Sequence, residues 1–277
     1  MRKGEIMNDL IIVRGGGDLA TGTIHKLHRC GFPLLILETE APSAIRRNVA
    51  FSEAVYEGTQ MVEGVTCHRA DSLAQAQGLL AEKKLALLVD PRGDAIAALK
   101  PMAVVDAILA KKNLGTHRDM APVTVALGPG FEAGRDVDAV IETSRGHNLG
   151  RVLWQGCAAP NTGIPGIIGG YGKERVIYSP AAGILRNCRG ITDTVAKGDI
   201  IATVETERGS VPVTATLDGL LRGLIRDGYR VREGFKIADI DPRANEYHNC
   251  FTISDKARCI AGGVVEAILQ RKGELGL

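Results

Sequence analysis

Aromatic side chains are scarce in this sequence. They make up 4% of the 277 residues and include a single tryptophan, so the stacking platforms that bind single-stranded nucleic acids are not expected. Lys and Arg number 34 against 32 Asp and Glu, which leaves a net charge of +2. This near balance argues against a basic nucleic-acid surface and against a charged disordered tail. We therefore expect no nucleic-acid partner.

Targeting and membrane-spanning signals are also missing. The first ten residues carry charges and no long apolar stretch, so they do not predict a signal peptide. The longest uncharged run, residues 152–172, is 21 residues long but contains Pro160, Pro165 and six glycines, which disfavour a membrane helix. The six cysteines form no CxxC pair and repeat no zinc-ligand spacing. These features predict reduced thiols, no metal site and a cytoplasmic protein.

Glycine, in contrast, is abundant, at 34 residues, where roughly 7% is usual. The first cluster lies between a short apolar run at 9–14 and a segment of helical spacing at 19–29, which a second apolar run at 34–37 follows. We expect strand, turn, helix and strand in that order. Further on, the pattern predicts helices at 72–84 and 101–112 and strands at 85–89 and 122–127.

Alternating apolar strands and helices predict a parallel sheet that is covered on both faces. The resulting fold class is α/β, with an N-terminal Rossmann-like parallel sheet domain at 1–115. A Gly-rich α/β extension follows at 116–175, where 11 of the glycines fall between Gly128 and Gly172. Strands are expected there at 138–143 and 150–154. A closing helix at 254–272, capped by Ser254, is expected to return from a C-terminal segment, 246–277, to the α/β part.

An internal repeat occupies the third segment, 176–245. The pattern of Gly183, Leu185 and Val195 recurs 36 residues later at Gly219, Leu221 and Val231. Duplicated short strands between glycine turns predict two interlocked β halves, which resemble the barrel-sandwich hybrid of biotinyl and lipoyl domains. Those domains carry a modified lysine on the hairpin between the halves. The corresponding stretch here, 205–212, has none, so a covalent carrier function is disfavoured.

The first candidate site is the Gly-x-Gly-x-x-Ala pattern that begins after the first strand. Glycines there let backbone N–H groups approach a pyrophosphate, and the helix dipole favours the negative charge. Asp18 would compete with a phosphate for the same donors. Glu38, at the end of the next strand, could hold a ribose hydroxyl. A tight turn that binds nothing is the alternative. The predicted cofactor-binding residues of this region are Gly15, Gly16, Gly17, Asp18, Ala20 and Glu38.

Two charged motifs follow. Arg46 and Arg47 could bind a phosphate group bidentately, or form a solvated surface pair. Asp90 and Asp94, at a strand end, could bind a metal or accept protons, and turn formation or helix capping explains them equally well.

The Gly-rich segment supplies the remaining candidates. Gly128 and Gly130 could form an anion-accepting nest, with Arg145 as an anion clamp and Asn161 nearby. His147 could carry a proton, and Cys157 could carry sulfur or selenium as a thiolate. Each of these side chains also has a purely structural interpretation. Asp90, His147 and Cys157 are the candidate catalytic residues.

Taken together, the motifs resemble the YqeB-type accessory proteins of selenium-dependent molybdenum hydroxylases, with a more distant likeness to the XdhC proteins. The resemblance spans nearly the whole chain and is carried by VRGGGDLATG (13–22), RRNVAFSEAV (46–55), VDPRG (89–93), VALGPGFEAGRDVDAVIET (125–143), RGHNLGRV (145–152), PNTGIPG (160–166), GFKIADIDPR (234–243) and ISDKAR (253–258).

This resemblance implies a protein that binds and helps to insert or activate a molybdenum cofactor, including its labile selenium, in a hydroxylase of the xanthine dehydrogenase type. The implied cofactor is molybdopterin-type, with NAD(P) as the other candidate, and the implied partner is the molybdenum hydroxylase apoenzyme. An NAD(P)-binding oxidoreductase is the alternative function. The sequence leaves turnover, homo-oligomer formation and the identity of the small anionic ligand open.

Overall fold

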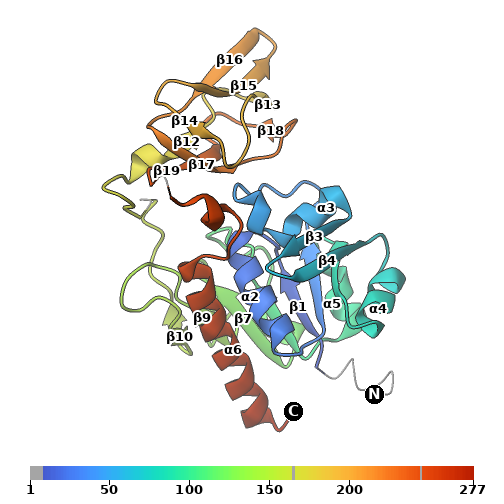
Figure 1. The fold of residues 1–277 in the computed structure, drawn as a ribbon. Helices are drawn as coiled ribbons and strands as arrows, with labels where there is room; N and C mark the ends of the chain where they lie inside the picture. Colours follow the sequence, from blue (N-terminus) through green and yellow to red (C-terminus); the bar gives the residue numbers. More distant parts are fainter. Residues whose placement is uncertain (1–8, 164–165, 244) are drawn as a thin grey trace. The chain divides into compact units, whose positions relative to one another are not determined.

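The computed structural model describes residues 9–163, 166–243 and 245–277. The Met1–Asn8 part of the N-terminal segment and two residues of the PNTGIPG motif, Ile164 and Pro165, lie outside them. The chain forms two compact units (Figure 1). Unit 1 comprises residues 1–42, 50–161 and 253–277, and unit 2 comprises 43–49 and 162–252. The closing helix and most of the Gly-rich segment thus belong to the same unit as the N-terminal strands.

Unit 1 is built on a nine-stranded sheet in the order β10-β9-β7-β6-β1-β2-β5-β4-β3. The pairs from β9 to β4 are parallel, and the two edge strands β10 and β3 are antiparallel. Its strands are β1 (Ile11–Arg14), β2 (Leu34–Glu38), β3 (Thr59–Val62), β4 (Val65–Ala70), β5 (Leu85–Val89), β6 (Ala103–Asp106), β7 (Val123–Leu127), β9 (Ala139–Ile141) and β10 (Val152–Leu153). A separate small pair joins β8 (Glu132–Ala133) to β11 (Gly156–Cys157).

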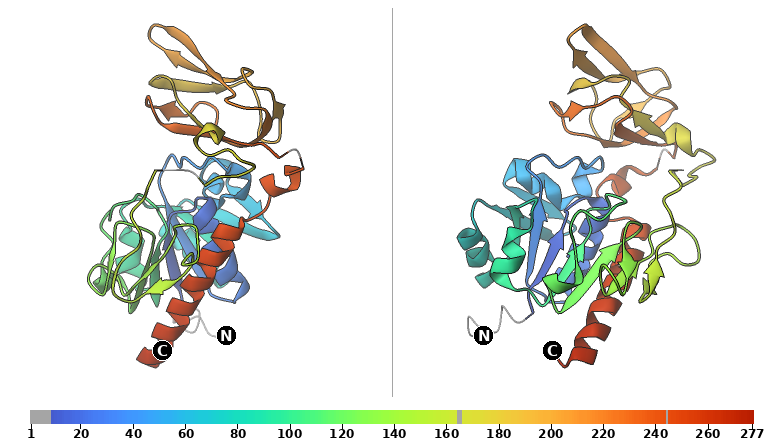
Figure 2. Two further views of the ribbon diagram at one scale, coloured as in Figure 1. Left: turned by 90° about the vertical axis from the view of Figure 1, so that its left-hand side faces the viewer. Right: turned by 180° about the vertical axis from the view of Figure 1, so that it is seen from behind.

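The helices of unit 1 are α2 (Asp18–Arg29), α3 (Ala54–Glu57), α4 (Leu73–Ala81), α5 (Asp94–Leu99) and α6 (Asp255–Leu275), with 3-10 turns η2 (Phe51–Glu53) and η3 (Arg118–Met120). Helices α2 and α6 pack on each other, and α6 also contacts β7, β9 and β10. In the right-hand view of Figure 2 the red α6 lies beside these green strands. A Cβ on Gly22 would come within 2.7 Å of the Ala257 Cβ, so glycine is what allows this close approach.

Unit 2 contains two four-stranded antiparallel sheets, β12-β19-β17-β14 and β16-β15-β13-β18. Their strands are β12 (Val176–Tyr178), β13 (Gly183–Asn187), β14 (Thr194–Val195), β15 (Ile200–Thr206), β16 (Gly209–Thr214), β17 (Gly219–Leu224), β18 (Arg230–Val231) and β19 (Lys236–Asp241). The 3-10 turns are η1 (Arg47–Val49), η4 (Lys173–Arg175) and η5 (Tyr247–Cys250).

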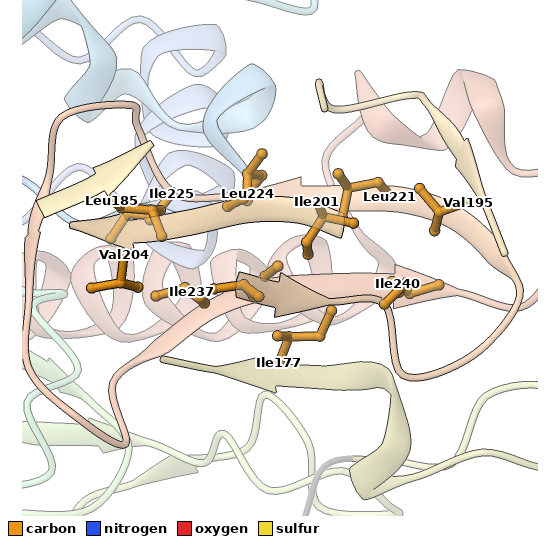
Figure 3. Close-up of a cluster of buried hydrophobic side chains, with 14 of the residues drawn as sticks. Ile177, Leu185, Val195, Ile201, Val204, Leu221, Leu224, Ile225, Ile237 and Ile240 are labelled. Atoms are coloured by element: carbon orange, nitrogen blue, oxygen red, sulfur yellow. The ribbon is translucent and has the colours of Figure 1, made fainter. Parts of the chain in front are cut away.

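The sequence repeat explains how these sheets share one core. Strand β14 of the first copy pairs with β17 of the second copy, and strand β18 of the second copy pairs with β13 of the first. Repeated positions meet inside, where the side chains of Leu185, Leu221 and Ile237 are fully buried (Figure 3). Hydrophobic burial of this kind is the dominant favourable contribution to folding.

The predicted fold class is corrected by this architecture. The sheet of unit 1 is mixed, and it extends through β7, β9 and β10 into the segment that was expected to form a separate extension. Unit 2 is a pair of four-stranded antiparallel sheets, so the barrel-sandwich hybrid assignment is wrong.

One predicted helix is also wrong. Residues 101–112 form the fully buried strand β6 followed by a loop, because Ala103, Val104 and Val105 insert between β1 and β7. The β-branched side chains of Val104 and Val105 favour a strand in that position. The hairpin of β3 and β4 was not predicted. Within the part of the chain that the structure describes, no helix has the length and apolar character needed to span a bilayer.

Candidate functional site

The chain reverses its direction of travel across the sheet of unit 1 between β1 and β6. From β1 the chain adds strands toward β5, and from β6 it adds strands in the opposite direction toward β9. In sheets of parallel strands, ligands bind at the carboxyl ends beside such a switch point. The loops after β1, β2, β5, β6 and β9 all leave from this edge. The carboxyl edge of the sheet contains most of the candidate residues that the sequence analysis selected.

The Gly15–Gly17 turn lies at this switch point. Gly15 has φ +94°, and a Cβ there would lie 3.0 Å from the Ala107 carbonyl oxygen of the neighbouring loop. A Cβ on Gly16 would lie 3.0 Å from the Ser52 nitrogen. Around Gly17, in contrast, a Cβ would meet no atom within 4 Å. The turn is therefore closed by packing at its first two residues and open at the third.

The backbone N–H groups of the turn are used unequally. Gly15 N donates to the Leu37 carbonyl at 2.8 Å, and Gly16 N donates to Glu38 Oε2 at 2.8 Å. Glu38 Oε1 also accepts from Thr39 N. Glu38 thus holds the turn together in this structure, which differs from the predicted ribose contact. Helix α2 begins after Gly17, which offers no side-chain cap. The predicted residue Ala20 is fully buried in this helix.

A buried polar bridge joins the two strands at the switch point. Arg14 Nη1 donates to Thr116 Oγ1 at 2.5 Å, and Thr116 Oγ1 donates to Asp106 Oδ2 at 2.6 Å. All three side chains are at least 96% buried, and the Arg14–Asp106 ion pair measures 3.8 Å. Burial raises the pKa of Asp106, against the hydrogen bonds from Thr116 and Ile108. Sequence reasoning missed this bridge, although both charges end apolar strands.

Cations collect where α6 begins. Arg145 Nη1 lies 3.2 Å from Asp255 Oδ2 in the first turn of α6. Lys256 is half-buried, and burial, followed by the positive charge of Arg145, lowers its pKa, while Asp18 and Glu142 oppose that shift. The positive charge of Lys256 therefore interacts with the carboxylate of Asp18 at the start of α2. Sequence reasoning did not select Lys256.

Other predicted residues have structural roles. Asp90 accepts from the backbone nitrogens of Gly93, Asp94 and Ala95 at 2.8–3.1 Å, so it caps the short helix α5. Arg46 donates to two backbone carbonyls of unit 2, and Arg47 donates to the Leu224 carbonyl at 2.8 Å. Both arginines therefore belong to unit 2 and bind its backbone.

The other Gly-rich candidates have packing roles or exposed side chains. A Cβ on Gly128 would lie 2.6 Å from Thr143 Oγ1, and one on Gly130 would lie 2.7 Å from the Lys112 backbone, so close packing explains both glycines. The side chains of His147, Cys157 and Asn161 are exposed. Among the described residues, no group of three or more His, Cys, Asp or Glu is arranged to hold a metal ion.

Comparison with known proteins gives one strong relationship. No family model matches the chain. The curated protein "Uncharacterized protein YqeB" of Escherichia coli K12 is 50% identical over 262 residues, which cover 95% of this chain. The chain is a homologue of this part of YqeB. The match covers 48% of the relative, so the chain spans about half the length of the curated protein it matches. The YqeB component of the predicted resemblance is thereby confirmed.

Several solved structures are similar at a low level. The ectoine utilization protein EutE (DoeB) from Ruegeria pomeroyi has 10% identity and a TM-score of 0.26, covering 84% of this chain and 86% of that one. An aspartoacylase family protein from Mesorhizobium loti has 14% identity and a TM-score of 0.29, and a succinylglutamate desuccinylase/aspartoacylase from Rhodobacter sphaeroides has 11% and 0.28. Each of these two covers 86% of both chains. Likeness at this level assigns no activity to the present chain.

The function implied by the resemblance is corrected by these comparisons. The homologue is named as uncharacterized, and the similar structures are named as desuccinylases, aspartoacylases or an ectoine utilization protein. Nothing among them supports molybdenum-cofactor insertion, a selenium step, xanthine dehydrogenase maturation or the alternative NAD(P) oxidoreductase. Those predictions are wrong and are not retained. The predicted hydroxylase partner and the predicted cofactors are not tested by these findings.

Proposed function

We propose that the protein binds a small anionic molecule, bearing a phosphate or carboxylate group, at the carboxyl edge of the sheet in unit 1. The proposal rests on the open space beside Gly17, where a Cβ would meet no atom within 4 Å. This residue precedes a 12-residue helix, has no side-chain cap to offer and has free space on its Cα. The first N–H groups of a helix lack intrahelical acceptors, and the dipole there favours negative charge.

Charge around the turn supports the same ligand class. Asp18 would repel an anion, but the ammonium of Lys256 offsets its charge, and the nearby Arg145 is paired with Asp255. The half-buried ammonium of Lys256 also interacts with the charges of Glu142 and Asp255. Burial and Arg145 lower the pKa of Lys256. As the pH rises, Lys256 should therefore lose its proton, and the protein its affinity for the anion, at a lower pH than with an ordinary lysine.

Gly17→Asp tests the proposal without threatening the fold. The backbone at Gly17 has φ −64° and ψ 179°, which any residue adopts and which suits an N-cap. An aspartate there should cap α2 and stabilise the protein by roughly a few tenths of a kcal/mol, while its carboxylate takes the place of the ligand anion. We expect calorimetry to detect binding of pyrophosphate or succinate to the wild type and none to Gly17→Asp.

Two further variants complete the experiment. Lys256→Gln should weaken binding about tenfold, a typical loss for one charge-assisted contact, while Lys84→Gln, an exposed lysine of the same unit, should bind like the wild type. Wild-type protein that binds neither probe, or Gly17→Asp protein that binds both normally, would refute the proposed site. The predicted molybdopterin-type and NAD(P) cofactors both carry phosphate groups and would be tested next by competition with pyrophosphate.

A further inference from the structure

Unit 2 contains an open cavity of about 890 Å³ that the proposed site in unit 1 does not use. It lies at one end of the sheet of β13, β15 and β18, and the β15–β16 turn and the loop after β18 close its sides. The volume falls in the range of about 300–1,000 Å³ that small-molecule sites occupy. The cavity is therefore large enough for a ligand of more than one chemical group.

One wall of the cavity is aromatic, in a sequence that has few aromatic residues. The rings of Tyr229 and Phe235 lie nearly parallel, with an angle of 16° and centroids 6.1 Å apart. Both rings pack against the buried core of unit 2, which fixes their positions, and both also line the cavity. A fixed aromatic face of this kind stacks with a planar heteroaromatic ring.

The rim of the cavity is rich in arginine. Arg208, Arg230 and Arg232 all line it and are exposed, and the Arg232 guanidinium carbon lies 6.0 Å from the Phe235 ring centroid. Two carboxylates, Glu205 and Glu207, also line the cavity.

These charges leave an excess of positive charge at the rim. Glu205 accepts from Arg186 Nε at 3.0 Å, so a cation outside the cavity already offsets one carboxylate. Guanidinium groups bind phosphate through paired hydrogen bonds, and the rim therefore suits a phosphate group.

The turn that carries Arg208 is held in place from within. Thr206 Oγ1 donates to the Gly209 carbonyl at 2.7 Å and accepts from Arg208 N at 3.1 Å. This places the Arg208 backbone in a defined turn at the cavity edge. The cavity thus combines a fixed surface for stacking with a positively charged rim on one side of a single unit.

We propose that this cavity binds a nucleotide, with the base stacked on the Tyr229–Phe235 face and the phosphates held by the arginines of the rim. Neither feature alone selects this class, because a planar neutral molecule would not use the arginines and inorganic phosphate would not use the rings. The two together favour a ligand that joins a heteroaromatic ring to a phosphate group.

The test uses the full chain and three probes, ADP, adenosine and pyrophosphate, each titrated by calorimetry into the wild type and into Gly17→Asp, where the proposed site of unit 1 does not contribute. ADP should bind at least about tenfold more tightly than either fragment, because only ADP engages both parts of the cavity. Arg232→Gln should weaken ADP binding about tenfold, a loss typical of one charge-assisted contact. Phe235→Leu should do the same through lost stacking. Arg189→Gln and Tyr178→Leu, exposed side chains of unit 2 outside the cavity, are the matched controls and should bind ADP normally.

Two results would overturn the proposal. One is the absence of ADP binding to the wild type. The other is ADP binding that Gly17→Asp abolishes while Arg232→Gln and Phe235→Leu leave it unchanged, because that pattern places the nucleotide in unit 1. Arg232 is exposed, so its variant should fold and keep the test decisive even if Phe235→Leu is unstable. Conversely, ADP binding that survives Gly17→Asp and fails in both cavity variants separates this cavity from the site in unit 1.

Discussion

Each unit buries aspartates beside arginines, but the two arrangements differ in how the charges are satisfied. In unit 1 a single arginine reaches Asp106 mainly through the hydroxyl of Thr116. In unit 2, Asp241 accepts hydrogen bonds directly from Arg222 at 3.2 Å and from two Arg243 nitrogens at 2.9 Å. Burial opposes the charged form in both places. Only the second arrangement supplies enough donors to outweigh it, so the pKa is raised at Asp106 and lowered at Asp241.

The largest expected effect follows from removing Arg14, the arginine that pairs with Asp106 in unit 1. Arg14→Met should lower the free energy of unfolding by about 3 kcal/mol, because it leaves a buried carboxyl without its cation. Urea denaturation would measure this loss. Arg29→Met, at an exposed position of the same unit, should change stability by less than about 0.5 kcal/mol. The double variant Arg14→Met/Asp106→Leu should recover much of the loss, and no recovery would contradict the interpretation.

Unit 2 should tolerate a comparable change better, because its network contains more partners. Asp241→Asn should cost about 2 kcal/mol, within the range for hydrogen bonds to charged groups. The matched control is Glu246→Gln, at the edge of the same network, where Arg243 Nη2 lies 3.1 Å from the carboxylate. That change should cost less than about 1 kcal/mol, because a half-exposed pair is screened by solvent. Equal losses in the two variants would argue against a buried network centred on Asp241.

A smaller effect isolates the neutral bridge of unit 1. Thr116→Val keeps the shape of the side chain but removes the hydroxyl between Arg14 and Asp106. The expected cost is about 1.5 kcal/mol, the lower end for hydrogen bonds to charged groups, measured by the same urea titration. Thr116→Ser, which retains the hydroxyl, should be closer to the wild type, and a serine variant as unstable as the valine variant would point to packing instead.

The opposite pKa directions also predict opposite pH responses. Hydrogen bonds from Arg243 outweigh the desolvation that burial imposes, so the folded pKa of Asp241 is lowered. Its contribution to stability is present above the ordinary aspartate pKa and is lost as the pH falls through the folded value. Burial raises the folded pKa of Asp106, so its contribution is present below the ordinary value and is lost as the pH rises through the folded one.

Hydrogen exchange during acidification would measure this contrast. As the pH falls below the usual aspartate range, amides of β19 should lose protection before amides of β6. Asp241→Asn should remove the pH dependence from β19, since an amide does not titrate. Loss of protection in β6 first, or at the same pH as β19, would show that other groups control the acid response.

Local features of this molecule could be predicted from the sequence, and features set by distant contacts could not. The Gly15–Gly17 turn follows from an apolar strand, glycines and a helical pattern that are adjacent in the chain. The misassigned strand β6 has apolar residues whose spacing also fits a helix, and only its neighbours β1 and β7 decide between the two. Similarly, nothing near Arg46 and Arg47 in the sequence shows that residues 43–49 join unit 2.

The candidate site shows the same limit. Lys256 comes near Asp18 because α6 packs on α2, and the decisive close approach is between Gly22 and Ala257, which are far apart in the sequence. A helix-start lysine has no special pattern by itself. The capping role of Asp90 was one of two predicted alternatives, and the three backbone donors that it accepts explain the residue in the structure.

The contact of α2 with α6 also has a consequence for synthesis. Unit 1 is made of three separated stretches of chain, and the last of them leaves the ribosome after all of unit 2. Domains fold during synthesis from the N-terminal side onward. Unit 2 can therefore complete its fold first, while the apolar surface of α2 around Gly22 stays uncovered until α6 has been synthesised.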